Sequence, residues 1–468
     1  MNIRNHWKLA CVFSAVCAAA AVPLSAQTFS VITDFNGADG SDPSYANLLQ
    51  GLDGDLYGTT FTGGAHLYGT VFKVTPTGTL TTIYSFCSQG GGMCTDGSGP
   101  LAGLILGTDG NFYGITTWGG TQGQGTVFKI TPAGKLTTLA SLGGAQGIYP
   151  YGPVVQASDG NLYGTTYTGG ANGYGVVFRV TLQGAFTDLH DFNMTAGAGP
   201  SAGLIQGADG GLYGTTFSGG TGTACEDGCG TVFRITLSGK LTTLYNFDMT
   251  DGACPYARLL QASDGNFYGT TNCGGANGWG TVFKLTPRGV LTTLHSFDSA
   301  DGGVPYAGLV QTASGDLYGT TRYGGANSDG TAFKIASDGT FTSLFSFDGA
   351  DGTWPSGGLV EATSGIFYGA TQSGGVEGKG TIFSESAGLS PFVLALPSLG
   401  KAGAAVRILG TNLGGATSVS FNGTGASFKV VSGSLIEAAV PSGATTGTIQ
   451  VNTPGGTLST NLPFRVIQ

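Results

Sequence analysis

The chain has 468 residues, of which only 10% are charged, and a formal net charge of −9. An acidic chain repels phosphate backbones and anionic headgroups, so the composition predicts no nucleic-acid partner. The 87 glycines follow no collagen-like triplet, which leaves either disorder or an all-β fold dense in tight turns, and the hydrophobic content of 40% favours the second.

Residues 1–26 have the layout of a secretory signal peptide. Arg4 and Lys8 precede an apolar run over residues 9–22, and small residues end the segment at Ala26. A membrane anchor is the alternative, but this run is shorter than the roughly 20 residues of a spanning helix. No later segment contains such a run. We therefore expect a secreted or cell-surface product with no membrane span.

Seven similar units occupy residues 27–385. In each unit a proline precedes a Tyr-Gly pair, and a Gly-Gly pair and a Gly-Thr-Val-Phe-like segment follow it. A period of 50 to 56 residues indicates a repeat architecture. The tyrosines of the seven pairs are Tyr57, Tyr113, Tyr163, Tyr213, Tyr268, Tyr318 and Tyr368.

Each unit contains four short segments typical of strands. In residues 298–347 they lie near 307–311, 316–321, 330–335 and 341–347, and Ser-Gly or Asp-Gly turns separate them. No unit has helical periodicity. Four antiparallel strands in each of seven units predict a seven-bladed β-propeller.

The two ends of the repeat array complement each other. The seventh unit ends after its third strand, at about residues 380–384, whereas residues 28–35 match the fourth strand of the other units. We therefore expect residues 28–35 to pair antiparallel with residues 380–384, as the outer strand of the seventh blade. An unpaired edge would otherwise remain.

One segment of the repeat shows a resemblance to a known family. The segment over residues 156–178, Gln-Ala-Ser-Asp-Gly-Asn-Leu-Tyr-Gly-Thr-Thr-Tyr-Thr-Gly-Gly-Ala-Asn-Gly-Tyr-Gly-Val-Val-Phe, closely resembles the bacterial GloVer (Gloeo_Verruco) tandem repeat. The resemblance covers roughly residues 28–384 and implies an exported protein. It supplies no catalytic residues to transfer to this chain.

A different pattern begins near residue 390. The segments Val406-Arg-Ile-Leu-Gly-Thr-Asn-Leu413 and Gly447-Thr-Ile-Gln-Val-Asn-Thr-Pro454 are similar to those of an IPT/TIG domain. The resemblance implies an immunoglobulin-like β-sandwich over residues 386–468, acting as a spacer or an interaction module. Short alternating strands over this length suit such a sandwich.

Six cysteines remain after residue 26, and an even number in an exported chain predicts disulfides. Two pairs each share one insertion in the repeat. The third pair joins an inter-blade loop to the end of the second strand in the same blade. The predicted disulfides are Cys87–Cys94, Cys225–Cys229 and Cys254–Cys273.

Acidic loops between blades are candidate calcium sites, because calcium prefers six to eight oxygen ligands. Aspartate and glycine are also ordinary turn formers, which is the competing interpretation. No other cofactor is indicated. The candidate ligands are Asp248, Asp251, Asp298, Asp301, Asp348 and Asp351.

Aromatic side chains that vary between blades are the candidate ligand-binding residues. We expect them on the face that carries the inter-blade loops, where they suit a glycan or a protein partner. A role in covering blade edges is the competing interpretation. These residues are Trp118, Tyr149, Tyr151, Tyr167, Tyr174, Trp279, Tyr323 and Trp354.

The sequence shows no catalytic residues. His190 and His295 occupy equivalent fourth-strand positions that hold Tyr84 or Ala140 in other units, so they are packing positions. The leading hypothesis is a noncatalytic extracellular binding or scaffold protein. The alternative is a propeller enzyme, a lyase or a glycosidase acting on extracellular polysaccharide, which as a glycosidase would need a pair of carboxylates.

Overall fold

The computed structural model describes residues 28–43, 47–89 and 92–467. The signal peptide predicted over residues 1–26 lies outside these ranges. No helix in the described ranges is long and apolar enough to cross a bilayer. Apart from two short 3-10 helices, η1 (Gly144–Gln146) and η2 (Leu413–Gly415), the regular structure of these residues is all β.

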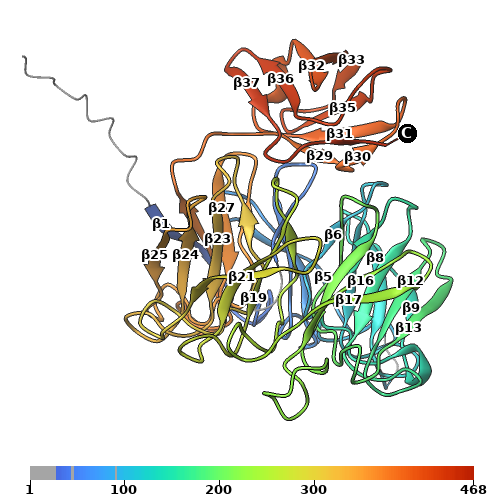
Figure 1. The fold of residues 1–468 in the computed structure, drawn as a ribbon. Coiled ribbons are helices and arrows are strands. Elements are labelled where there is room, and N and C mark those ends of the chain that lie inside the picture. The colour runs from blue at the N-terminus through green and yellow to red at the C-terminus, as the bar shows by residue number, and fades with distance from the viewer. Residues whose placement is uncertain (1–27, 44–46, 90–91, 468) are drawn as a thin grey trace, which may run out of the picture.

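Seven four-stranded antiparallel sheets follow one another along residues 28–386, as in a β-propeller (Figure 1). The first three consist of β2 (Leu49–Gln50), β3 (Leu56–Thr60), β4 (Thr70–Val74) and β5 (Leu80–Ser85); β6 (Ile105–Leu106), β7 (Phe112–Thr116), β8 (Thr126–Ile130) and β9 (Leu136–Ser141); and β10 (Val155–Gln156), β11 (Leu162–Thr166), β12 (Val176–Val180) and β13 (Phe186–Asp191).

The next three sheets repeat this order. They consist of β14 (Ile205–Gln206), β15 (Leu212–Thr216), β16 (Thr231–Ile235) and β17 (Leu241–Asn246); β18 (Leu260–Gln261), β19 (Phe267–Thr271), β20 (Thr281–Leu285) and β21 (Leu291–Ser296); and β22 (Val310–Gln311), β23 (Leu317–Thr321), β24 (Thr331–Ile335) and β25 (Phe341–Ser346). We number the units one to seven by their second strands.

The seventh sheet joins the two ends of the array. It contains β26 (Val360–Glu361), β27 (Ile366–Ala370) and β28 (Thr381–Ser386), and its outer strand is β1 (Thr28–Asp34). Strand β1 pairs antiparallel with β28, and the register shifts after Val31, as it shifts between the third and fourth strands of the other units. The predicted pairing of the N-terminal strand is confirmed.

Aromatic packing links each unit to the next. The phenylalanine that ends a fourth strand meets the third-strand phenylalanine of the following unit edge to face; Phe86 and Phe128 lie 5.3 Å apart. Across the closure, Phe35 of the seventh sheet meets Phe72 of the first at 5.1 Å. The Tyr-Gly glycine serves this packing, because a Cβ on Gly58 would lie 2.6 Å from the Phe72 ring. The core therefore lies between neighbouring sheets.

Residues after 386 form a separate pair of sheets. One has the order β29-β31-β35-β34 and the other β33-β32-β36-β37, with β30 and β38 as a parallel pair. The strands are β29 (Leu394–Leu396), β30 (Leu399–Gly400), β31 (Ala405–Leu409), β32 (Ser418–Phe421), β33 (Thr424–Ala426), β34 (Phe428–Val430), β35 (Leu435–Ala439), β36 (Ile449–Thr453), β37 (Gly456–Ser459) and β38 (Arg465–Val466).

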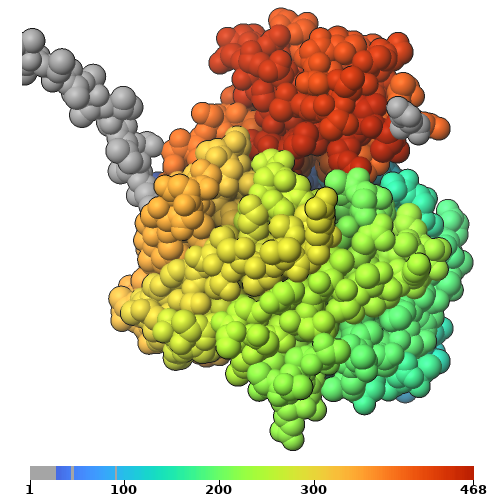
Figure 2. Space-filling model, in the orientation of Figure 1, coloured from blue at the N-terminus to red at the C-terminus, as the bar shows by residue number. Residues whose placement is uncertain are grey.

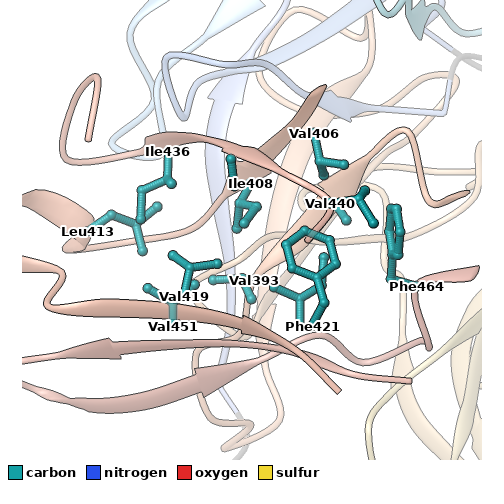
Figure 3. Close-up of a cluster of buried hydrophobic side chains, with 13 residues drawn as sticks. Val393, Val406, Ile408, Leu413, Val419, Phe421, Ile436, Val440, Val451 and Phe464 are labelled. Carbon is teal, nitrogen blue, oxygen red and sulfur yellow. The ribbon is translucent and has the colours of Figure 1, made fainter. Parts of the chain in front are cut away.

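The two C-terminal sheets share one core, shown in Figure 3. Ile408 and Ile436 from the first sheet face Val419, Phe421 and Val451 from the second, and all are almost fully buried. Alternating strands with one buried face produce such a core. We call this part the C-terminal region.

The C-terminal region rests on one face of the ring (Figures 1 and 2). Its contacts reach turns that are far apart in the sequence. Ser434 Oγ donates to Leu52 O at 2.9 Å, Arg465 Nη1 to Gly207 O at 3.2 Å, and the Phe392 N–H to Thr363 O at 3.0 Å. The turns between first and second strands therefore form the covered face of the ring.

Candidate functional site

The covered face is built from one polar network that recurs around the ring. In five units the Tyr-Gly hydroxyl donates to the aspartate of the preceding Asp-Gly turn, as Tyr113 does to Asp109 at 2.8 Å. Lys129 also reaches Asp109 at 2.8 Å. Burial and the Asp109 carboxylate raise the pKa of Tyr113. Because this network recurs, the Tyr-Gly pair has a structural role in the units that contain it.

Glutamines connect neighbouring turns on this face. Gln156 Oε1 accepts the Thr108 N–H at 2.9 Å, while its Nε2 donates to Gly160 O of its own turn at 3.0 Å. Five units have this bridge. The other two have Leu106 and Glu361 at the same position. Burial raises the pKa of Glu361 to about 7, although Asn461 donates to its carboxylate at 2.9 Å.

The opposite face carries the inter-unit loops and the loops between second and third strands. The residue before each unit's proline has a positive φ, whether it is a glycine or a larger residue such as Tyr149 (φ 58°), Val304 (φ 53°) or Trp354 (φ 58°). Left-handed backbone is costly for such side chains and clusters at functional sites. The loops of this face are therefore held by the surrounding structure.

A continuous series of half-buried rings crosses five units on this face. Neighbouring members contact each other through their rings, or through a guanidinium over a ring. We call the series the aromatic arc; it consists of Tyr149, Tyr151, Tyr167, Phe217, Tyr256, Tyr306, Arg322, Tyr323 and Trp354.

Distances along the arc fall in the range of ring contacts. The Tyr151 and Tyr167 centroids lie 5.2 Å apart, and those of Tyr256 and Tyr306 lie 4.9 Å apart. The Arg322 guanidinium carbon lies 5.0 Å from the centre of the Tyr306 ring. Burial raises the pKa of Tyr151 and that of Tyr167. Both hydroxyls therefore stay protonated at neutral pH and can donate hydrogen bonds.

One side of the arc is polar. The fourth residue after the tyrosine of each Tyr-Gly pair is aromatic in units one, three and four, whereas units five, six and seven have Asn272, Arg322 and Gln372 there. Arg322 Nη2 donates to Gln372 Oε1 at 2.9 Å. Asn272 is buried, and its Oδ1 has no hydrogen-bond partner among the described residues. Apolar rings beside a few fixed polar groups are typical of ligand sites.

The arc contains five of the eight aromatic residues that the sequence suggested. Trp118 instead contacts Phe61 at 5.1 Å, while Tyr174 and Trp279 are 40% and 38% exposed. Sequence reasoning missed Phe217, Tyr256, Tyr306 and Arg322. Their common signal was register, since each follows either a second strand or a unit's proline.

The acidic loops are stabilised from within. Asp248 Oδ1 accepts the Thr250 N–H at 3.0 Å, and Asp251 Oδ1 accepts the Asp248 N–H at 3.1 Å. In the next unit, His295 Nε2 contacts Asp301 Oδ2 at 2.8 Å. Among the described residues, no group of three or more His, Cys, Asp or Glu is placed to hold a metal ion. Calcium binding stays a prediction.

Two of the three predicted disulfides are present, Cys87–Cys94 and Cys225–Cys229. The third is not formed, and Cys254 and Cys273 are free thiols. The backbone pairs Cys273 with Ala253, so Cys254 lies one residue beyond the opposed position. The thiols interact through a hydrogen bond, which raises the pKa of Cys254 and lowers that of Cys273.

Solved structures share the all-β fold. The extracellular domains of two hybrid two component systems of B. thetaiotaomicron match at TM-scores of 0.51 and 0.52, with 12% and 11% identity. They cover 94% and 95% of this chain, which spans 57% and 60% of theirs. This likeness is one of fold. No curated protein matches the sequence.

The repeat itself identifies the family. The model of the Gloeobacter/Verrucomicrobia repeat matches residues 20–225, 91–261 and 222–395, so the overlapping matches extend over more than half of the sequence. The expected kinship of the repeat units is confirmed, and the chain belongs to the Gloeobacter/Verrucomicrobia repeat family.

Proposed function

We propose that this protein is a noncatalytic extracellular binding module that captures a glycan or a protein with its aromatic arc. The observation that carries the proposal is the unbroken contact from Tyr149 to Trp354 over five units, next to the polar group of Asn272, Arg322 and Gln372. Rings supply area at a low cost in side-chain entropy, and amides and the guanidinium supply direction.

The asymmetry of the arc supports binding over a purely structural role. Edge-covering residues would recur in register, as the buried phenylalanines between sheets do. The position after the second strand instead changes from Phe61 through Thr117 and Tyr167 to Arg322. Variation within a fixed frame is expected where loops carry function.

A hydrolytic or eliminating enzyme is the weaker alternative. The arc, as defined, contains no carboxyl group, whereas a glycosidase needs two of them about 5 to 9.5 Å apart. In the inter-unit loops of the same face, Asp251 and Asp301 already interact with Tyr245 and His295. This arrangement favours recognition over bond cleavage.

The wider organisation belongs to the same proposal. The seven sheets are the blades of one seven-bladed propeller over residues 27–385, and residues 386–468 are an immunoglobulin-like IPT/TIG sandwich that serves as a spacer. Residues 1–26 direct export as a signal peptide. The two disulfides support an oxidising compartment.

A glycan array with protein lacking residues 1–26 tests the proposal, with a binding screen against bacterial surface proteins in parallel. For a ligand found in either, Tyr167→Ala should weaken binding about tenfold, which corresponds to about 1.4 kcal/mol. Trp279→Ala is the matched control, because Trp279 is an exposed aromatic on the same face outside the arc. Equal losses from both variants would contradict the arc as the binding site.

A further inference from the structure

A cavity of about 640 Å³ lies where the covered face of the ring meets the C-terminal region. First-strand residues and turns line it from the ring, including Val155, Ile205 and Gln261. Leu396, Leu462 and Arg465 line it from the C-terminal region. The volume suits a small organic molecule.

Arg258 lines the same cavity and interrupts the regularity of the ring. It stands three residues after its unit's proline. Counted back from the last residue of each first strand, the corresponding residues of the other units carry no charge: Asn47, Gly103, Pro153, Gly203, Gly308 and Gly358. These segments lie where neighbouring units approach each other, because a Cβ on Gly308 would lie 2.9 Å from Arg258 O. One unit thus places a cation where the other units have none.

The Arg258 charge has no counter-charge nearby in the described part of the chain. Arg258 is exposed and lines the cavity, and within the described ranges its side chain has neither a hydrogen bond nor an ion pair. Arg465 adds a second guanidinium to the cavity wall while one of its nitrogens donates to Gly207 O. In a protein of net charge −9, two cations on an apolar wall favour an anion there.

We propose that this cavity binds a small organic anion, with a carboxylate on the Arg258 guanidinium and an apolar body against Val155, Ile205, Leu396 and Leu462. Guanidinium groups bind carboxylates through two parallel hydrogen bonds, and apolar walls favour a ligand with a ring or short chain. The site lies on the covered face and is separate from the aromatic arc. It uses residues of both parts of the molecule.

Benzoate and benzamide are a matched pair of probes, because they differ mainly in charge. Ligand-observed NMR titration of the protein lacking residues 1–26 should show benzoate binding at least tenfold tighter than benzamide. Arg258→Gly should weaken benzoate binding at least tenfold and leave thermal unfolding unchanged, because four other units have glycine at this position and still form complete four-stranded sheets. Arg465→Met should weaken benzoate binding by a smaller factor.

Two control variants distinguish this site from other cations. Arg288→Ala removes an exposed arginine in a hairpin turn and should leave benzoate binding unchanged. Arg322→Gln, which copies Gln372 of the next unit, tests whether benzoate binds in the aromatic arc instead, and it should also have no effect. Three outcomes would overturn the proposal. They are equal binding of the two probes, no benzoate binding at about 10 mM benzoate, and loss of benzoate binding in Arg322→Gln but not in Arg258→Gly.

Discussion

The two faces of the ring are built by the same seven units and differ in regularity. On the covered face, the Tyr–Asp hydrogen bond recurs in five units and the glutamine bridge in five. On the opposite face, which carries the aromatic arc and is called the open face below, equivalent positions change from Phe61 to Asn272 and Arg322. A network that most units repeat serves stability, whereas positions that change within a fixed backbone are free to serve recognition.

Removing β1 should have the largest effect, because it breaks both faces together. Deleting residues 28–35 exposes the edge of β28 and removes Phe29 and Phe35, of which Phe35 is fully buried. Loss of one buried phenylalanine alone costs about 3 to 5 kcal/mol. We expect the deletion variant to unfold at much lower urea concentration than the parent, or to aggregate. Unfolding at the parent's midpoint would contradict ring closure by β1.

Glu361→Gln gives the seventh unit the glutamine that five other units have at this position of the covered face. Burial raises the pKa of Glu361 in the folded protein to about 7, above its ordinary value of 4.5, so the folded state holds this proton more tightly. Stability should therefore fall as pH rises from about 4.5 to 7, by about 2 kcal/mol after allowance for partial exposure. The variant should lose this dependence and be more stable than the parent at pH 8, as measured by urea unfolding at several pH values.

The matched control at this position is Gln311→Glu, which converts a regular unit into the irregular form. It should introduce a pH dependence of the same sign, with stability lower at pH 8 than at pH 5. A Glu361→Gln variant that retains the parent's pH profile would show that another group causes the dependence.

Tyr113→Phe removes one hydrogen bond of the repeated network and should cost about 1 to 2 kcal/mol, since the acceptor is a charged carboxylate. Chemical unfolding measures the loss, and ligand binding at the open face should not change. Tyr167→Phe, in the arc, is the reciprocal variant and should leave stability within about 0.5 kcal/mol. Weaker binding in Tyr113→Phe would contradict the division of roles between the faces.

Calcium is expected to have the smallest effect. If an Asp-x-x-Asp-Gly loop binds it with a Kd near 1 mM, 5 mM calcium should stabilise the protein by about 1 kcal/mol for each site. Thermal unfolding in calcium, compared with magnesium at equal ionic strength, measures the shift. Unchanged unfolding in calcium would exclude these loops as calcium sites.

The repeated parts of the fold could be predicted from the sequence. The spacing of the prolines and Tyr-Gly pairs gave the strand pattern, and the missing fourth strand located the partner of β1. Members of the candidate site that do not recur from unit to unit were harder to predict. Phe217 and Tyr256 have unremarkable neighbours in the chain, and their role follows only from contact across a unit boundary, 6.4 Å between ring centres.

The same limit applies to the contact between the two parts of the molecule. Ser434 meets Leu52 over a separation of 382 residues, and Arg465 meets Gly207 over 258. These contacts have no period, because each uses one side chain and one turn carbonyl. The predicted Cys254–Cys273 disulfide is not formed, although the two thiols lie close enough to interact through a hydrogen bond.

The pairing of β1 with β28 has a consequence for the order of folding. Thr28 is synthesised early, whereas Ser386, its partner at the end of the array, is synthesised after all seven units. Extending a loop from one unit to seven adds only about 2 kcal/mol of closure entropy, so the finished ring loses little stability by it. The pairing of β1 with β28 nevertheless joins residues that are far apart in the sequence, and contacts of this kind form slowly. Until that last strand pairs, both edges of an open array stay available to other chains, and this interval is when a chaperone would protect the protein most.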